Sequence, residues 1–372
     1  MAAPTRPDLP RVVIAGQTPP PVLGQYVATA DLVERLAGSG RFRVEHLPFR
    51  FARAADDLRV ARIGKFAELA RIIGRTVRLR LRGGIDFLVY PVGGPSAVVA
   101  LRDTVLLPPL MVLSRRTVLL FHSGGHAEAW SAGSVWQRAA TAVYRRAVAG
   151  IVLTEFGRRD PEALGIGRVF VAPHELADRR EPDLISRGTG PPRILYLGSI
   201  DSQKGVPDLI EAVSRLDEDF TLVLVGESHP SYPESKVSED IERLTLDGQV
   251  ERTGVLTGHR KAEELGRADL LVFSSTHPGE TFGLVLVEAM MWALPMIAVD
   301  WRGAVDVVGD VPRELLVDAD PPLSDSLERG LRFAFDNRLR WEEWGARNRE
   351  RYEERYRPGA STAFEDALEA LL

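Results

Sequence analysis

Residues 276–290 read THPGETFGLVLVEAM and follow a short apolar run that ends at Phe273. The apolar run predicts a buried strand, and the residues from about Gly283 onward predict a helix, so a loop joins the two. Glu280 lies in that loop, and Glu288 lies eight positions later in the helix. A helix start offers unpaired backbone amides to a diphosphate, and a carboxylate accepts paired hydroxyls through its two oxygens. The segment therefore predicts a site for a phosphorylated ligand that carries hydroxyl groups.

The sequence around this segment alternates between short apolar runs and helical stretches. In the C-terminal half, strands are expected at 193–197, 220–225, 270–273 and 295–299, with helices near 207–216, 238–246, 262–266 and 284–293. In the N-terminal half, strands are expected at 11–16, 87–90, 118–121 and 150–153, with a first helix at 24–36. Continuous apolar strands between helices are typical of parallel sheets covered on both faces. Both halves are therefore predicted to be α/β.

The length of the chain predicts more than one domain. At 372 residues it exceeds the size at which a single hydrophobic core keeps growing. Residues 178–192 read DRREPDLISRGTGPP, a charged stretch rich in proline and glycine that predicts a linker. We therefore expect an N-terminal Rossmann-like domain over 1–178, a linker over 179–192 and a C-terminal Rossmann-like domain over 193–357. Residues 358–372 are expected to form a helix that packs back on the N-terminal domain.

The composition excludes several classes of protein. Hydrophobic residues make up 45% of the chain and charged residues 27%, as in ordinary globular proteins. The chain has no cysteine, which excludes disulfides and thiolate metal sites. Its first ten residues are polar and proline-rich, unlike a signal peptide, and no run approaches the roughly 20 apolar residues of a membrane span. A cytoplasmic location is expected.

Charge is distributed unevenly along the chain. Residues 1–178 carry 24 Lys and Arg against 15 Asp and Glu, whereas residues 179–372 carry 23 against 37. Between Arg50 and Arg82 the chain carries ten basic residues against three acidic ones, with apolar residues at helical spacing. Such a helix can lie on anionic lipid at the inner face of the membrane, and the alternative is an ordinary surface helix over the sheet. No nucleic acid partner is predicted.

The motif in residues 276–290 resembles a known family. Glu280, Phe282, Gly283 and Glu288 reproduce the Glu, seven residues, Glu signature of the retaining glycosyltransferases of family 4. The resemblance implies the GT-B fold, in which two Rossmann-like domains with parallel sheets face a central cleft, with the acceptor on the N-terminal side. It also implies that Glu288 holds the ribose of a nucleotide-sugar donor and that Glu280 holds the transferred sugar. The backbone amides of Phe282, Gly283 and Leu284 would lie near the sugar and phosphate.

A second segment, residues 194–212 (ILYLGSIDSQKGVPDLIEA), resembles the family's strand, Gly-Arg, loop, Lys-Gly and helix. Gly198 and Lys204 match, and the resemblance implies that Lys204 binds the donor phosphates. The family's arginine is Ser199 here, and losing one charge-assisted contact costs about 1.5–3 kcal/mol. Arg302, in a loop after a C-terminal strand, is the candidate substitute, and a solvated arginine is the alternative.

Two features of the N-terminal half resemble the N-terminal side of the family's cleft. Residues 16–25 (GQTPPPVLGQ) resemble its glycine-containing first loop, whose backbone, with Gly16 and Gly24, would lie against the donor phosphates or the acceptor; an ordinary proline-rich turn is the alternative. The loop lacks the G-x-G-x-x-G spacing, so a dinucleotide site is not supported. His122, directly after the strand at 118–121, resembles the strand-end histidine on the acceptor side.

No metal site is predicted. His122 and His126 are four residues apart, but the Gly-Gly between them argues against one helix face, and a third ligand is missing. Asp318-Ala-Asp320 spells D-x-D, the metal motif of another glycosyltransferase class, but its proline-rich surroundings predict a turn before a helix. We therefore expect a metal-independent reaction and no cofactor.

The predicted function is that of a retaining glycosyltransferase. It would move a hexose-type sugar from a UDP- or GDP-sugar to a hydroxyl acceptor, which is a saccharide, a lipid-linked glycan or a small metabolite. Glu280, His122 and Lys204 are the catalytic candidates of a front-face mechanism. Two alternatives stay open: Ser199 is compatible with a catalytically weak nucleotide-sugar-binding protein, and the fold is compatible with a sugar-nucleotide epimerase or a phosphorylase.

Overall fold

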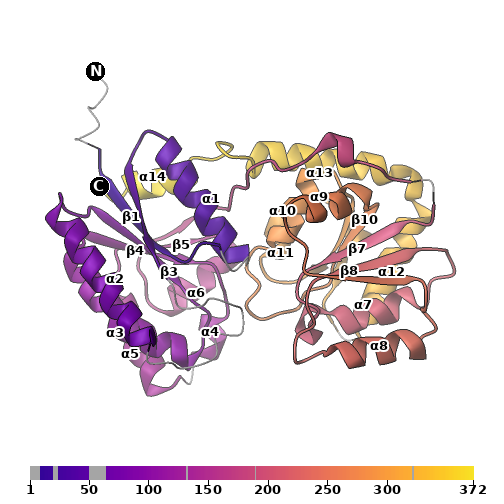
Figure 1. Ribbon diagram of the computed structural model, residues 1–372, viewed down its shortest axis with the longest axis horizontal. Coiled ribbons are helices and arrows are strands. Elements are labelled where there is room, and N and C mark those ends of the chain that lie inside the picture. Colours follow the sequence, from indigo (N-terminus) through magenta and orange to yellow (C-terminus); the bar gives the residue numbers. More distant parts are fainter. Residues whose placement is uncertain (1–8, 20–23, 50–63, 131–132, 189, 321) are drawn as a thin grey trace. The chain divides into compact units, whose positions relative to one another are not determined.

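The computed structural model describes residues 9–19, 24–49, 64–130, 133–188, 190–320 and 322–372. The chain divides into two compact units (Figure 1). The first unit is Met1–Leu176 with Pro358–Leu372, and the second is Ala177–Arg357. Each unit contains one six-stranded parallel sheet, so the predicted fold class of two Rossmann-like α/β domains is confirmed.

The first sheet has the strand order β2-β1-β3-β4-β5-β6. Its strands are β1 (Arg11–Gly16), β2 (Arg43–Pro48), β3 (Phe87–Val92), β4 (Arg116–Phe121), β5 (Ala149–Val152) and β6 (Val169–Val171). The helices of this unit are α1 (Gly24–Gly38), α2 (Gly64–Leu81), α3 (Ala97–Leu113), α4 (His126–Ala129), α5 (Val135–Tyr144), α6 (Arg159–Ala163) and α14 (Ala363–Glu369), with a 3-10 turn η3 (Phe156–Arg158).

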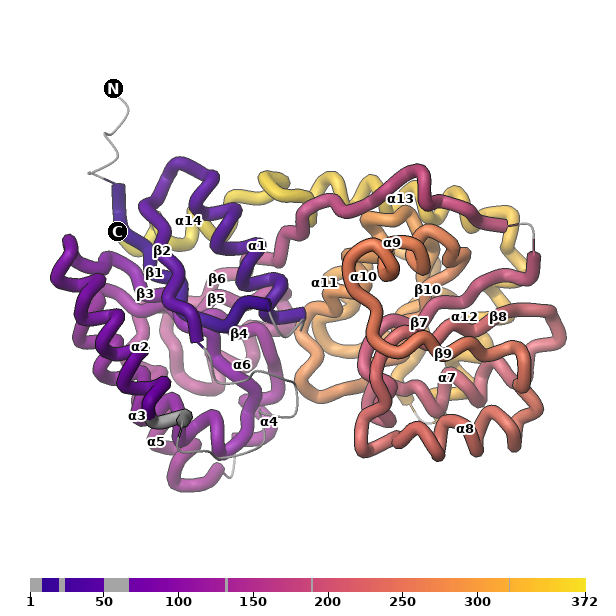
Figure 2. The backbone as a smooth tube through the Cα atoms, viewed as in Figure 1, coloured from indigo at the N-terminus to yellow at the C-terminus, as the bar shows by residue number. Residues whose placement is uncertain are grey.

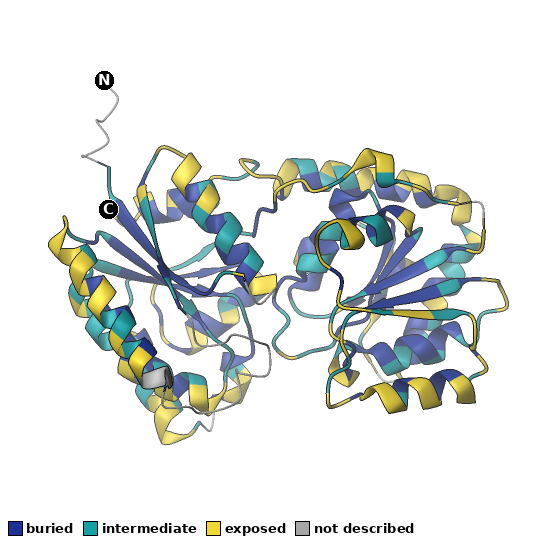
Figure 3. Ribbon diagram, in the orientation of Figure 1, coloured by how far each residue is buried: buried dark blue, intermediate teal, exposed yellow. Residues whose placement is uncertain are grey.

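Different helices cover the two faces of the first sheet. α2, α3 and α5 lie on one face, and α1 and α14 lie on the other (Figure 1). The central strands between these layers are almost wholly buried (Figure 3). Burial on both faces explains why their sequences are continuous apolar runs rather than alternating ones.

The second sheet has the strand order β12-β11-β10-β7-β8-β9. Its strands are β7 (Arg193–Leu197), β8 (Thr221–Val225), β9 (Val250–Gly254), β10 (Leu270–Phe273), β11 (Met296–Asp300) and β12 (Leu316–Asp318). The helices are α7 (Val206–Val213), α8 (Glu234–Arg243), α9 (Gly258–Arg267), α10 (Leu284–Met291), α11 (Ala304–Val308), α12 (Leu323–Asp336) and α13 (Trp341–Arg355). Four 3-10 turns complete the unit: η4 (Pro182–Leu184), η5 (Ser202–Lys204), η6 (Arg313–Leu315) and η7 (Arg338–Arg340).

The order of strands reverses once in each sheet. From β1 the chain moves outward to β2 and then returns to β3 on the other side of β1, and β7 and β10 flank the same kind of reversal in the second sheet. Ligands of doubly wound sheets bind outside the carboxyl ends of the strands at such a switch point. The fold therefore directs attention to the segments that follow β1, β3, β7 and β10.

The segment expected to be a linker, residues 179–192, packs on the second unit. Arg187 donates hydrogen bonds to the carbonyl oxygens of Ala293 (3.0 Å) and Trp292 (2.5 Å). A Cβ on Gly266 of α9 would lie 2.3 Å from the carbonyl oxygen of Leu184, so α9 approaches η4 backbone to backbone. The stretch therefore packs on the second unit through the Arg187 side chain and the backbone of Leu184, and the two compact units divide between Leu176 and Ala177.

The chain returns to the first unit at Pro358 and ends with α14 (Figure 2). Arg35 of α1 pairs with the buried Glu365 of α14, with 2.6 Å between guanidinium nitrogen and carboxylate oxygen. Glu175, just before the chain leaves the first unit, accepts hydrogen bonds from the backbone amides of Gly359 (2.8 Å) and Ser361 (3.0 Å). The Glu175 carboxylate thus connects the segment that leaves the first unit with the segment that returns to it.

Sheet edges and one helix differ from the sequence expectation. β2, β6, β9 and β12 were not expected as strands, because these edge strands are only partly buried and their apolar runs are short or interrupted. The apolar stretch at 104–113 forms the second half of α3, which continues through Pro108 and Pro109. Among the described residues, the structure contains no helix with the length and apolar character that a membrane crossing requires.

Gly226, directly after β8, offers a test of close packing at the end of the second sheet. Its φ is +154°, and a Cβ there would lie 1.7 Å from the carbonyl oxygen of Gly198. We expect Gly226→Ala to destabilise the second unit by at least about 3 kcal/mol, because a backbone atom cannot move aside as a side chain can. Thermal and urea unfolding measure the loss.

Gly248→Ala is the matched control for this variant. Gly248 also has a positive φ (+83°), but a Cβ there meets no atom within 4 Å. Its substitution is expected to cost only the backbone strain of about 1–2 kcal/mol. Equal losses in the two variants would contradict the proposed collision.

Candidate functional site

The candidate site of the second unit lies where β7 and β10 end. β7 and β10 are neighbours in the sheet, and each is followed by a turn and a helix: η5 and α7 after β7, and residues 274–283 and α10 after β10. Parallel strands end at the same edge of a sheet, so these two connections meet although they are far apart in the sequence. Lys204 comes from the first connection and Glu280 from the second.

Lys204 and Glu280 form an ion pair. The distance from Lys204 Nζ to Glu280 Oε2 is 2.6 Å, and the side chain of Glu280 is only 13% exposed. Ser275 Oγ donates a further hydrogen bond to the same oxygen (3.2 Å). Burial raises the pKa of Glu280, but the charge of Lys204 and these hydrogen bonds together hold the pKa below its usual value. Glu280 is therefore a carboxylate at neutral pH.

The backbone around Lys204 is fixed by close contacts with the other connection. Ser274 Oγ donates to the carbonyl oxygen of Lys204 (2.8 Å), and Gly205 has a φ of +67°. A Cβ at Gly205 would lie 2.2 Å from the carbonyl oxygen of Ser274, so only glycine allows this approach. Gly205 is also the N-cap of α7, which places the start of that helix beside the ammonium group.

Glu288 of α10 forms a second ion pair with Lys261 of α9. The distance from Lys261 Nζ to Glu288 Oε1 is 2.6 Å, and both side chains are partly exposed. Lys261 was not predicted from the sequence. The rarity of lysine could have pointed to Lys261, because the chain has only four lysines among 47 basic residues. Two of these four lysines pair with the two acids of the motif.

The residues between the two acids start helix α10. Gly283 is its N-cap with a φ of +72°, and Leu284 is its first residue. Phe282 is buried and packs edge-on against the ring of Tyr356, with 5.8 Å between ring centroids. The aromatic anchor and the glycine turn together hold the start of α10 at the carboxyl edge of the sheet, between Glu280 and Glu288.

Gly198 and Ser199 follow β7 directly. Gly198 is the residue that Gly226 approaches, and the carbonyl oxygen of Ser199 accepts a hydrogen bond from the Tyr196 hydroxyl (2.7 Å). The Ser199 residue is exposed. Ser199 stands where the family named above has an arginine, so this position offers only a small hydroxyl side chain.

Arg302 follows β11 in a conformation that arginine rarely adopts. Its φ is +50°, and its guanidinium carbon lies 5.3 Å from the centroid of the Trp301 ring. Trp301 Nε1 in turn donates to the carbonyl oxygen of His277, three residues before Glu280 (3.1 Å). A non-glycine residue with positive φ costs of order 1–3 kcal/mol and is often found at functional sites. These contacts attach Arg302 to the loop that carries Glu280.

In the first unit, Gly16 ends β1 and Gly24 begins α1. Gly16 has a φ of +146°, and its carbonyl oxygen accepts a hydrogen bond from the amide of Phe49 (2.9 Å). Of the loop expected at 16–25, residues 20–23 lie outside the described residues. Both glycines thus lie at the carboxyl edge of β1, the strand that borders the switch point.

His122 follows β4 and contacts a second histidine. Its Nδ1 lies 3.1 Å from His174 Nε2, and the two rings stack with 5.0 Å between centroids. Burial lowers the pKa of His122 to about 4, and burial together with the neighbouring His122 lowers the pKa of His174 well below its usual value. Both imidazoles are therefore neutral at pH 7. His174 was not predicted, because 52 residues separate it from its partner.

His126 has a packing role. Its Nε2 lies 3.0 Å from the carbonyl oxygen of Gly93, and its buried ring packs edge-on against Phe121 and Trp130. Among the described residues, no group of three or more His, Asp or Glu side chains has the geometry of a metal site. Asp318 of the D-x-D sequence ends β12 and pairs with Arg313 at 2.6 Å.

Taken together, the second unit can bind a phosphorylated, hydroxyl-rich ligand. A lysine and two helix starts supply positive charge for phosphate oxygens, and two ordered carboxylates supply acceptors for hydroxyls. Such a site at a switch point defines the class of doubly wound α/β proteins that bind ligands at the carboxyl ends of their strands.

Comparison with known proteins finds a family match in the second unit. Residues 180–351, nearly all of the second unit, match the family of glycosyl transferases group 1. The matched range contains Lys204, Lys261, Glu280 and Glu288.

Curated relatives resemble part of the chain. The α-maltose-1-phosphate synthase of Mycolicibacterium smegmatis is 32% identical over 170 residues, which is 43% of this chain and 43% of that protein. The phosphatidyl-myo-inositol mannosyltransferase of Mycobacterium tuberculosis is 29% identical over 201 residues, 51% of this chain and 50% of that protein. The chain spans about half the length of the curated relatives it matches.

A solved structure resembles the chain over both units. HepE of Anabaena, solved in complex with UDP, is 16% identical with a TM-score of 0.68, covering 97% of this chain and 99% of HepE. The chain thus has the GT-B fold of two Rossmann-like domains.

The neutral histidine pair predicts how stability depends on pH. An unfolded histidine titrates near 6.5, whereas His122 in the folded protein titrates at about 4. Between these values the unfolded chain binds more protons, so the free energy of unfolding falls as pH is lowered from about 6.5 to 4. Thermal unfolding from pH 4 to 8 measures this loss. His122→Asn with His174→Asn should flatten the curve, and an unchanged slope would contradict the assignment.

Proposed function

We propose that the chain is a retaining glycosyltransferase that uses a nucleotide-diphosphate sugar as donor. The observation that carries this proposal is the Lys204–Glu280 ion pair at the switch point of the second sheet, with Glu288 in the helix α10 that follows Glu280. The match of residues 180–351 to the family of glycosyl transferases group 1 supports it. Lys204, Glu280 and His122 are the proposed catalytic residues.

The proposed donor site follows from charge and position. The diphosphate would lie against Lys204 and the starts of α7 and α10, so that it competes with Glu280 for the ammonium group. Glu280 would then accept hydroxyls of the transferred sugar, and Glu288, oriented by Lys261, would accept the ribose hydroxyls. Gly198, Phe282, Gly283 and Leu284 would line the same site with backbone atoms. The first unit would contribute Gly16 and Gly24 near the phosphates and His122 on the acceptor side.

The proposed reaction is a metal-independent front-face transfer. The leaving diphosphate would take the acceptor proton, and Lys204 with the two helix starts would stabilise its developing charge, so no protein nucleophile is needed. UDP-sugars are the first donors to test, since HepE binds UDP, with GDP-sugars next. One relative is an α-maltose-1-phosphate synthase and another is a phosphatidyl-myo-inositol mannosyltransferase, so the proposed acceptor is a hydroxyl compound of the saccharide, lipid-linked or small-metabolite type.

A peripheral contact with anionic membrane at the cytoplasmic face is part of the proposal. Residues 50–63 of the basic stretch lie outside the described residues, so the argument rests on α2. Arg75, Arg78 and Arg80 are exposed on α2, whereas its one acid, Glu68, is buried and pairs with Arg71 at 2.5 Å. An exposed arginine row without exposed carboxylates favours an anionic surface.

Glu288→Ala tests the donor site. We expect this variant to weaken binding of UDP- or GDP-sugar at least about tenfold and to abolish transfer, because the ribose loses its charged acceptor and Lys261 its partner. Calorimetry and a transfer assay, each run with chelator present, measure the two effects. Glu234→Ala, which removes an exposed ion pair with Arg252, is the control. Unchanged donor affinity in Glu288→Ala would refute the site, and wild-type binding without turnover on any acceptor would favour the binding-protein alternative.

Arg302→Asn tests the replacement of the missing arginine. Asparagine tolerates positive φ but carries no charge, so we expect kcat to fall about 10- to 100-fold if Arg302 faces the diphosphate. Ser199→Arg in the same background should restore kcat. Arg338→Asn is the control, since Arg338 also stacks on a tryptophan, Trp341, at 5.8 Å. If Arg302→Asn keeps the wild-type kcat, Arg302 does not replace the missing arginine and only packs on Trp301.

A further inference from the structure

Helix α3 exposes an uninterrupted apolar stripe. Val98, Leu101, Val105 and Val112 are 70%, 40%, 52% and 77% exposed, and their spacing of three, four and seven residues places them on one side of the helix. Pro108 and Pro109 lie between them, and the two charged residues of α3, Arg102 and Asp103, pair with each other at 2.7 Å. A surface helix whose outward side is wholly apolar marks an interaction site.

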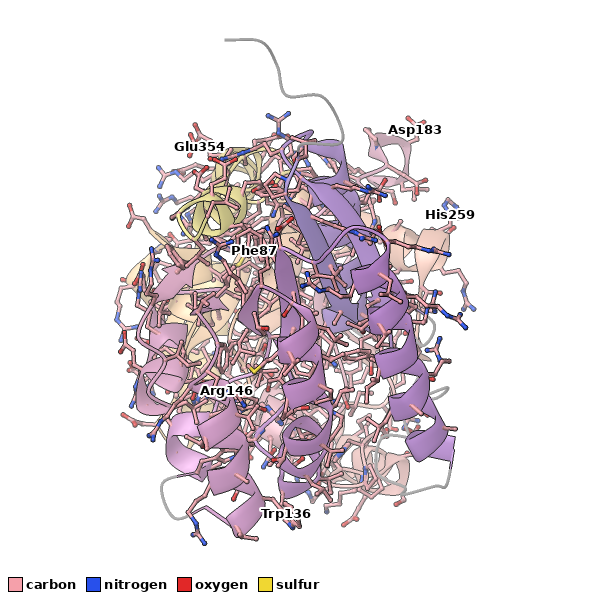
Figure 4. All side chains as sticks on the ribbon, turned by 90° about the vertical axis from the view of Figure 1, so that its left-hand side faces the viewer. Phe87, Trp136, Arg146, Asp183, His259 and Glu354 are labelled. Carbon is pink, nitrogen blue, oxygen red and sulfur yellow. The ribbon has the colours of Figure 1, made fainter. Side chains whose placement is uncertain are left out.

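The neighbouring helices extend this surface. α3 contacts both α2 and α5, and Figure 4 looks onto the three helices side by side, with Trp136 and Arg146 labelled on the α5 side. Val135 and Trp136 of α5 are 61% and 45% exposed, and Val77 and Leu81 of α2 are exposed as well. Eight of the eleven exposed large apolar side chains of the described residues lie on these three helices. We call this surface the three-helix face.

Basic residues surround the apolar stripe. Arg75, Arg78 and Arg80 are exposed on the α2 side, and Arg138 and Arg146 are exposed on the α5 side. The sequences of the three helices contain only two carboxylates, Glu68 and Asp103. Asp103 is wholly buried and accepts hydrogen bonds from the hydroxyls of Tyr90 and Tyr144, both at 2.6 Å. The three-helix face therefore presents apolar and cationic side chains and no exposed carboxylate.

We propose that the three-helix face docks on a bilayer that contains anionic phospholipid, with the α3 stripe and Trp136 in the interfacial layer and the arginines at the phosphates. The inference extends the α2 contact of the proposed function and rests on it. An acidic protein partner would need its own complementary apolar ridge, and a second copy of this face would bring arginine rows of like charge together. A planar anionic surface with apolar depth satisfies both components at once.

The face adjoins the acceptor side of the first unit. α3 and α5 begin beside each other, because Trp130 Nε1 and Gln137 Nε2 both donate to the carbonyl oxygen of Pro95 (2.8 and 3.1 Å). α3 follows β3 and α4 with α5 follows β4, so these helix starts lie at the carboxyl edge of the sheet, where His122 also lies. Docking along the three-helix face would therefore bring the carboxyl edge of the first unit's sheet near acceptors held at the membrane surface.

Vesicle sedimentation of the full chain tests the proposal. We expect the protein to sediment with phosphatidylcholine vesicles that contain phosphatidylglycerol and not with phosphatidylcholine alone, and to be released by salt. Val98→Glu and Val112→Glu should each lower the partition coefficient at least about tenfold, because a carboxylate replaces an inserted side chain beside anionic lipid. Arg78→Gln should lower it about fivefold. Val255→Glu, at a 61% exposed valine of the second unit, is the matched control and should bind as wild type.

Trp136 gives a second, local readout. Vesicles with phosphatidylglycerol should shift the fluorescence of the wild type to shorter wavelength, and Trp136→Phe should remove most of that shift while still sedimenting. No sedimentation at low salt, or Val98→Glu and Val112→Glu both binding as wild type, would overturn the proposal. A wild-type dimer that these variants dissociate, without vesicle binding, would overturn it in favour of self-association.

Two further measurements separate this inference from the transferase assignment. Val112→Glu should bind the nucleotide sugar in calorimetry as wild type does, since the donor residues lie in the second unit. Glu288→Ala should sediment with anionic vesicles as wild type does. Wild-type protein that binds anionic vesicles but no nucleotide sugar would refute the donor site alone, and wild-type protein that binds nucleotide sugar but no anionic vesicles would refute the docking surface alone.

Discussion

The meeting of the β7 and β10 connections is the constraint on which the rest of the site depends. Lys204 and Glu280 are 76 residues apart in sequence, and they form their 2.6 Å ion pair because both strands end at one edge of a parallel sheet. Gly205 permits the approach, since its missing side chain leaves room for the carbonyl oxygen of Ser274. A side chain at position 205 would push the two connections apart and so separate the ammonium group from the carboxylate.

Charge is organised by different means in the two units. In the second unit, lysines pair with the two acids of the motif, so positive and negative groups are both available to a ligand. In the first unit, the acids on α2 and α3 are buried and each pairs with an arginine, Glu68 with Arg71 and Asp103 with Arg102, so the outward face is cationic and apolar. The two arrangements differ in kind: ion pairs around a polar site in the second unit, and buried carboxylates beneath a cationic and apolar surface in the first.

The candidate site is built largely from helix starts and strand ends. Gly205 and Gly283 take up positive φ where α7 and α10 begin, and Arg302 adopts the same uncommon region beside Trp301. The backbone strain at Arg302 persists only where surrounding contacts hold it, here the hydrogen bond from Trp301 to His277. The packing of Phe282 on Tyr356 holds the start of α10. The same contacts that stabilise the second unit therefore also fix the positions of its functional groups.

The sequence by itself determined the α/β class, the central strands, the family motif and the residues Lys204, Glu280 and Glu288, because continuous apolar runs and fixed local spacing are legible along a chain. It did not reveal the edge strands β2, β6, β9 and β12, whose partial exposure weakens the apolar signal. Only the tertiary structure paired Lys261 with Glu288 and His174 with His122, turned residues 179–192 into part of the second unit, and exposed the apolar side of α3. These features depend on which distant segments the sheets bring together, and no local pattern encodes that proximity.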